Sequence, residues 1–112
     1  MSATAASPDT PQPPATPAAD CRSLDDVRRE IDRLDRAIVA LLCERGQYVL
    51  AAARFKRNAA EVHAPARVEQ VVANVRALAA AQGGLPDVVE AGYRALIAAY
   101  TVAERAEHER LS

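Results

Sequence analysis

Apolar residues recur at helical spacing along the first half of the chain. From residue 24 to residue 41 they follow one another at steps of three and four, at Leu24, Val27, Ile31, Leu34, Ile38 and Leu41. This spacing predicts one apolar seam along a helix. Ser23 suits the N-cap, and Asp25 and Asp26 complement the positive helix end. We expect the helix to reach about Lys56 or Arg57, roughly 50 Å, a length that needs a partner subunit to cover it.

Two shorter helices follow this long one. The pattern is lost from Asn58 to Ala64, and Pro65 suits the first turn of a second helix. Its buried side is expected at Val68, Val71, Val72, Val75, Leu78 and Ala79. Gly83 and Gly84 should end it, and a third helix opens at Pro86 and Asp87 with Val88, Val89, Tyr93, Leu96, Ile97, Tyr100 and Ala103 on its apolar side. We expect its charged end, residues 104–110, to fray. The fold class is therefore all-α, with a long, a short and a medium helix.

The first nineteen residues differ in composition from the rest. Residues 1–19 carry five of the seven prolines, between Ala, Thr and Ser. Such a stretch has no apolar face to bury and cannot offset its ordering entropy. We predict a disordered tail over 1–19 and one helical domain over 20–112, with a polyproline ligand as the alternative interpretation of the tail.

Composition and charge exclude several classes of protein. The 112 residues are 50% apolar with one Phe and no Trp, and their formal net charge is −1. That balance lacks the basic footprint of a nucleic-acid binder. No run approaches the ~18 apolar residues of a membrane span, and the N-terminus has no secretory pattern. Cys21 and Cys43 lack metal-ligand spacing and are expected to be free thiols. We expect a cytoplasmic protein.

Cationic residues are the best candidates for chemistry. No nucleophilic triad, metal cluster or phosphate loop is present, so we expect no metal, and His63 and His108 are interpreted as isolated surface histidines. On a continuous helix Arg45 and Lys56, eleven residues apart, point to one side, ~16 Å apart along the axis. Two such side chains can bracket a small dianion.

Two more cations could join this pair, although an ordinary explanation is available. Arg28 lies ~25 Å from Arg45 along the same helix, so it could reach the site only from a second chain in a two-fold dimer. Arg67 begins the second helix, and the short loop could bring it near. Arg and Lys on long helices usually form solvated stripes or pairs four residues apart, and spacing alone leaves that interpretation open.

The segment from Asp20 to about Glu109 resembles the AroQ class, or type II, of chorismate mutases. Within it the chain is most similar to the branch that contains isochorismate-pyruvate lyase. The strings that carry the resemblance are DCRSLDDVRREIDRLDRAIVALLCER, YVLAAARFK and APARV. The resemblance implies an intertwined all-helical homodimer whose active sites take residues from both subunits. It also implies a dicarboxylate substrate, chorismate or isochorismate, and a concerted pericyclic reaction without a cofactor.

Residue roles follow from the resemblance position by position. Arg28 matches the arginine donated by the neighbouring subunit, and Arg45 the arginine that grips a substrate carboxylate. Lys56 matches the lysine at the ether oxygen, and Arg67 a further arginine. Glu104 stands where many members have Gln, and its carboxyl could donate to the ether oxygen only when protonated; a surface position for Glu104 is the alternative. The walls expected around them are Val49, Ala52, Tyr100 and Thr101, which ordinary helix packing would explain equally well.

Two further positions bear on which reaction is catalysed. Mutases often hold the substrate hydroxyl with polar residues near the start of the second helix, where this chain has Ala64 and Val68. Their apolar character favours the lyase branch. The sequence still leads to chorismate mutase as the first hypothesis, because that reaction is the family's commonest. Isochorismate-pyruvate lyase is the second hypothesis, and a non-catalytic helical dimerisation module is the third.

Overall fold

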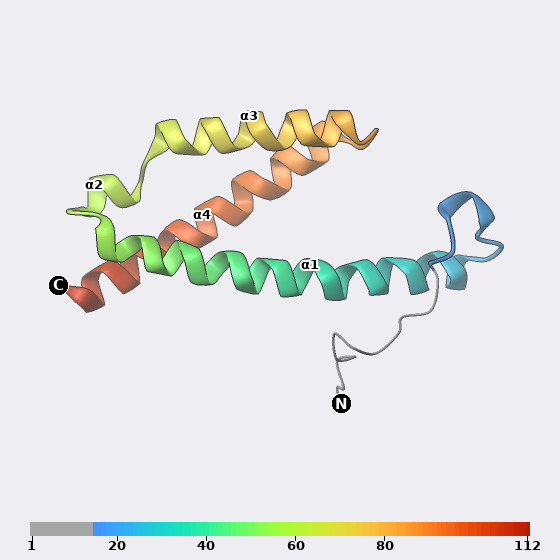
Figure 1. Ribbon diagram of the computed structural model, residues 1–112, viewed down its shortest axis with the longest axis horizontal. Helices are drawn as coiled ribbons and strands as arrows, with labels where there is room; N and C mark the ends of the chain where they lie inside the picture. Colours follow the sequence, from blue (N-terminus) through green and yellow to red (C-terminus); the bar gives the residue numbers. More distant parts are fainter. Residues whose placement is uncertain (1–14) are drawn as a thin grey trace. The chain divides into compact units, whose positions relative to one another are not determined.

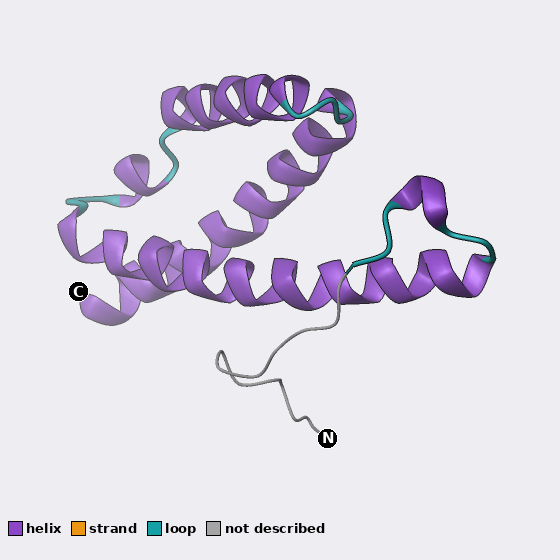
Figure 2. Ribbon diagram, turned by 45° about the vertical axis from the view of Figure 1, so that its right-hand side comes forward, coloured by secondary structure: helices purple, strands orange, loops and turns teal. Residues whose placement is uncertain are grey.

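The computed structural model describes residues 15–112, and within them every regular element is helical (Figure 2). The chain forms α1 (Leu24–Ala52), α2 (Ala59–Val62), α3 (Pro65–Ala81) and α4 (Pro86–Leu111), with 3-10 turns η1 (Ala18–Asp20) and η2 (Ala53–Phe55) (Figure 1). The predicted all-α class and its long, short and medium helices are confirmed. The predicted tail, residues 1–19, lies mostly outside the described residues, and its last residues enter η1.

The chain divides into two compact units, Met1–Leu41 and Leu42–Ser112. In the first, the predicted cap of α1 is confirmed, because Ser23 Oγ accepts from the N–H of Asp26 at 3.0 Å. The N–H of Arg22 donates back to the Asp26 carboxylate at 2.9 Å and holds the pKa of Asp26 below its usual value. The six seam residues from Leu24 to Leu41 are between 39% and 65% exposed in the single chain. Among the described residues of the first unit, this seam is therefore largely exposed.

In the second unit, α3 and α4 form a helical hairpin (Figure 1). Gly83 ends α3 with φ +70°, a left-handed conformation that glycine adopts without a Cβ clash. The N–H of Gly84 donates to the carbonyl of Ala79 at 2.8 Å and that of Gly83 to Ala80 at 3.1 Å, which is the Schellman pattern. Pro86 then starts α4. The sequence therefore predicted the end of α3 and the start of α4 correctly.

Ion pairs join the two helices of the hairpin. Arg94 on α4 contacts Glu69 on α3 at 2.8 Å and Glu90 on its own helix at 2.7 Å. Arg76 on α3 reaches Glu90 at 2.7 Å and Asp87 at 2.9 Å. Hydrogen bonds from Arg94 hold the pKa values of Glu69 and Glu90 below their usual range. Ion pairs at the surface such as these contribute little to stability.

The core of the second unit is small. Among the described residues the buried apolar side chains are Ala53, Val62 and Val72, at 2%, 4% and 4% exposure. Three expectations about burial were wrong for the single chain: Leu78 is 59% exposed, Val88 is 64% exposed and Ala103 is exposed as well. One neighbouring helix covers only a narrow stripe of α3 or α4, so the outer part of each apolar side remains open.

The sequence misplaced the end of the long helix. It was expected to continue to Lys56 or Arg57, but α1 ends at Ala52 and the turn η2 follows. Lys56 is extended, with φ −100° and ψ 137°. The alanine-rich run before it contains no Gly or Pro stop signal, and the change of direction accompanies burial of Ala53 and packing of η2 against α4.

Two further local expectations were wrong. The segment 58–64 contains α2, capped by Asn58, whose Oδ1 accepts from the N–H of Glu61 at 3.0 Å. A four-residue helix is too short to show apolar periodicity, although Asn58 with Glu61 three residues later is a capping signal. The end of α4 does not fray but continues to Leu111, because contacts from Glu104 and His108 fasten it to the segment around Lys56.

Candidate active site

One pocket of about 370 Å³ lies within the second unit. Its lining comes from the end of α1, the segment around Lys56 and α2, the start of α3, and one side of α4. Eight residues singled out from the sequence line it: Arg45, Val49, Ala52, Lys56, Arg67, Tyr100, Thr101 and Glu104. The volume is in the usual range for a small-molecule site.

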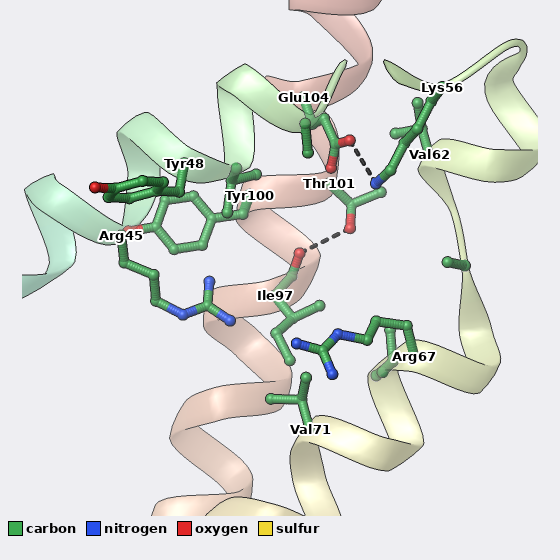
Figure 3. A pocket seen from close by; sticks show the side chains of 14 residues that line it. Arg45, Tyr48, Lys56, Val62, Arg67, Val71, Ile97, Tyr100, Thr101 and Glu104 are labelled. Carbon is green, nitrogen blue, oxygen red and sulfur yellow. Dashed lines mark hydrogen bonds and ion pairs between the residues drawn. The ribbon is translucent and has the colours of Figure 1, made fainter. Parts of the chain in front are cut away.

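Lys56 and Glu104 form an ion pair inside this pocket (Figure 3). Lys56 Nζ lies 2.6 Å from Glu104 Oε2, and the two side chains are 27% and 6% exposed. Within the described part of the chain, this oxygen is buried and has no partner other than the ammonium. The alternative interpretation of Glu104 as a surface residue was wrong, since α4 turns this side chain inward.

Arg45 and Lys56 do line one pocket, although the reason expected from the sequence was wrong. The expectation assumed that both stand on one continuous helix. In the structure Arg45 is on α1, whereas Lys56 follows η2 in an extended conformation. The chain direction changes at η2, so the ~16 Å axial separation of a straight helix does not apply.

Tyrosine rings support the guanidinium group of Arg45. Its central carbon lies 5.4 Å from the ring centroid of Tyr100 and 5.8 Å from that of Tyr93, within the range of cation–π attraction. The Tyr100 hydroxyl donates to the carbonyl of Leu42. Gly46 allows this approach, because a Cβ at that position would lie 3.0 Å from a Tyr100 ring carbon. The sequence did not assign Gly46 or Tyr93 to the site.

Arg67 completes the cationic lining. It stands in the first turn of α3, is exposed, and donates to Gln70 Oε1 at 2.6 Å. In Figure 3 the guanidinium groups of Arg45 and Arg67 point toward one another past Ile97, with the Lys56 ammonium farther along the same pocket. Three cations and one carboxylate therefore line the cavity. With all four groups ionised their sum is +2, which suits a dianionic ligand.

Apolar side chains form most of the remaining wall. Val49 and Ala52 were expected there, and the sequence did not assign Tyr48, Val62, Val71 and Ile97 to it. Ala64 and Val68 line the pocket as well, so the positions at which this chain lacks a hydroxyl-binding group do face the cavity. The Thr101 hydroxyl donates to the carbonyl of Ile97 at 2.8 Å. Periodicity marked Val71 and Ile97 only as buried positions, since it cannot separate a core from a pocket wall.

Three residues considered in the sequence analysis, Arg28, His63 and His108, lie outside the pocket lining. Arg28 is exposed on the part of α1 within the first unit and is not among the pocket-lining residues, so its role stays a prediction. His63 is exposed, as expected. His108 is not an isolated surface residue: it is half-buried, and its Nε2 lies 2.9 Å from the carbonyl oxygen of Lys56.

Over residues 15–112 no group of three or more His, Cys, Asp or Glu side chains is arranged to hold a metal ion. Both cysteines are free thiols, as expected. No described helix combines the length and the apolar character needed to cross a membrane.

Comparison with known proteins gives two matches. The family described as chorismate mutase type II matches residues 27–105. The chain is also similar to the isochorismate pyruvate lyase of Pseudomonas aeruginosa, with 40% identity over 91 residues, which is 81% of this chain and 89% of the relative. The matched family range includes all the pocket-lining residues and Arg28.

Proposed function

Since the chain belongs to the chorismate mutase type II family, we propose that its pocket binds a chorismate-type dicarboxylate and catalyses a pericyclic reaction on it. The observation that carries this proposal is the convergence of Arg45, Lys56 and Arg67 on one cavity with otherwise apolar walls. Both chorismate and isochorismate have two carboxylates and an enolpyruvyl ether, so three cations match two carboxylates and one oxygen on which negative charge develops.

Each cation has a proposed task. Arg45, which lies within cation–π distance of two tyrosine rings, grips one carboxylate in a bidentate fork. Arg67 binds the other carboxylate. Lys56 stabilises the charge that builds on the ether oxygen as its bond to carbon breaks. Such groups act by holding the substrate in a compact reactive conformer and by being in place before charge develops.

Glu104 has two proposed tasks that depend on its protonation. Ionised, it fixes the Lys56 ammonium at 2.6 Å. Protonated, it can donate a hydrogen bond to the ether oxygen, as an amide would. We therefore expect Glu104→Gln, whose amide always carries a donor, to retain measurable kcat. A complete loss of kcat in this variant would show that the carboxylate charge, and not a hydrogen-bond donor, is what the site requires at this position.

Between the two reactions, we put isochorismate pyruvate lyase first. Ala64 and Val68 line the pocket but offer no partner for the hydroxyl that mutases bind near the start of this helix. The 40% identical relative carries the name of that lyase. Together these observations move the preference away from the mutase, the first hypothesis from the sequence. Chorismate mutase is the second candidate, favoured by the family match and by the same set of cations.

We also propose that the active unit is a homodimer in which Arg28 comes from the second chain. The seam of α1 is 39% to 65% exposed, and the buried apolar side chains of the described residues number only three. A small domain with so little buried surface gains much from association. The resemblance gives Arg28 as the residue contributed across the interface. A fourth cation would further favour a dianion over a neutral ligand.

The test incubates the purified protein separately with isochorismate and chorismate. Salicylate together with pyruvate from isochorismate supports the lyase, and prephenate from chorismate supports the mutase. Lys56→Met should lower kcat by at least about a hundredfold, in the range of an electrostatic group at the reacting oxygen. Arg105→Met is the matched control, because Arg105 is an exposed cation of α4 outside the pocket lining. No product from either compound would refute the enzyme proposal and favour a dimerisation module.

A further inference from the structure

Two residues of α4 contact Lys56, one at its side-chain ammonium and the other at its backbone carbonyl. Its ammonium contacts Glu104 at 2.6 Å, and its backbone carbonyl oxygen lies 2.9 Å from His108 Nε2. Glu104 and His108 are four residues apart and so share one face of α4. The histidine contact joins positions 52 residues apart in the sequence, and it is separate from the pocket lining, which does not include His108.

The local backbone does not fix Lys56 as a helix would. Lys56 is extended after η2, its N–H donates to the carbonyl of Ala53 at 3.4 Å, and Asn58 already caps the next helix. The carbonyl of Lys56 is therefore outside any helical hydrogen-bond ladder. A contact to that carbonyl restrains the peptide plane after Lys56, and with it the direction in which the side chain leaves the backbone.

The chemistry of the contact requires His108 to donate. A backbone carbonyl only accepts, so the proton must be on Nε2, as it is in the Nε2–H tautomer and in the imidazolium ion. A side chain of similar length with an N–H at its end can replace it. One of the same length without a donor cannot.

We propose that His108 is a positioning residue that orients Lys56 for the reaction. This inference rests on the proposed function, because it takes Lys56 to be the group at the reacting oxygen. His108 acts through the backbone carbonyl of Lys56, and Glu104 restrains the ammonium at the end of the Lys56 side chain. Displacement of a catalytic group by about 1 Å can cost up to a hundredfold in rate, so the loss of one of two restraints should lower kcat measurably.

The test compares two substitutions of similar length that differ in the donor. His108→Met removes the N–H, and we expect kcat to fall about tenfold with KM changed less than twofold, because the substrate carboxylates are held by other residues. His108→Gln supplies an amide N–H and should restore kcat to within about threefold of the wild type. His63→Met is the control, since His63 is exposed, and should leave kcat unchanged.

Two results would overturn the proposal. One is equal kcat in His108→Met and His108→Gln, whether both fall or neither does, because the donor would then be irrelevant. The other is a fall in kcat that follows the thermal unfolding midpoint across the variants, which would indicate a purely structural role.

A readout without turnover separates this inference from the proposed function. The ¹³C shift of the Lys56 carbonyl reports its hydrogen bond, and we expect it to move in His108→Met and to stay near the wild-type value in His108→Gln. A protein inactive on both substrates would refute the proposed function, with the positioning role refuted along with it. An active protein whose Lys56 carbonyl shift is the same in wild type and His108→Met would refute the positioning role alone.

Discussion

Removal of Lys56 should destabilise the folded chain as well as inactivate it. In Lys56→Met the Glu104 carboxylate, 6% exposed as a side chain, loses the ammonium that lies 2.6 Å from its Oε2. At an effective dielectric constant of about 20 the attraction between two unit charges at this distance is roughly 6 kcal/mol. The cost of removing both charges from water cancels much of that, and loss of one partner from a fully buried pair costs about 3–5 kcal/mol.

The stability that Lys56→Met should lose is smaller than the loss for a fully buried pair. The Lys56 side chain is 27% exposed, so water can approach Glu104 once the ammonium is gone. We therefore expect Lys56→Met to lower the free energy of unfolding by about 2–3 kcal/mol. In Lys56→Met/Glu104→Gln no buried charge remains, and most of this loss should be recovered, to within about 1 kcal/mol of the wild type.

Urea unfolding followed by far-ultraviolet circular dichroism measures these free energies. All variants are compared at one protein concentration, because association contributes to apparent stability. Glu104→Gln completes the double-mutant cycle, and Arg105→Met, a surface change, should stay within about 0.5 kcal/mol of the wild type. The reasoning is refuted if Lys56→Met is as stable as the wild type, or if the double variant is no more stable than Lys56→Met.

Two further predictions concern packing and pH. Gly46→Ala should lower kcat/KM several-fold, because the new Cβ would lie 3.0 Å from the ring of Tyr100, which supports Arg45. Its stability should change little, because alanine in a helix gains up to about 1 kcal/mol over glycine. Gly92→Ala is the control, since nothing lies within 4 Å of its Cβ; equal activity of the two variants would contradict the packing argument. The lowered pKa of Glu90, caused first by the hydrogen bond from Arg94 and then by that from Arg76, predicts that stability falls in acid. This carboxyl binds protons less readily folded than unfolded, so its contribution is complete above the unfolded pKa and disappears as the pH falls through the folded one. Arg94→Met should make the urea midpoint less steeply dependent on pH between about pH 6 and pH 3, and an unchanged slope would count against this account.

The sequence alone determined the elements whose signals are local. Ser23 begins α1, Pro65 begins α3, Gly83 ends it and Pro86 begins α4. Each of these residues acts within one turn of its own position, through a cap, a missing N–H or a permitted left-handed conformation. The apolar spacing predicted helices, because this pattern depends only on neighbours three and four residues away.

The candidate site could be predicted in part. Arg45, Lys56 and Arg67 were identified from their charge and from the family resemblance, and they do line one pocket. Gly46 and Tyr93 were missed, because no local pattern shows that a glycine on one helix faces an aromatic ring on another. Arg28 remains a prediction, since its proposed place depends on a second chain.

Tertiary structure decided where the long helix ends and which charged residues are buried. The run before Lys56 contains no stop signal, and the change to η2 accompanies burial of Ala53 and packing against α4. Glu104 and His108 look like solvent-facing residues of a charged helix end, yet both contact Lys56, about fifty residues earlier. Burial and ion pairing depend on which distant segments meet, and spacing within one helix carries no information about that.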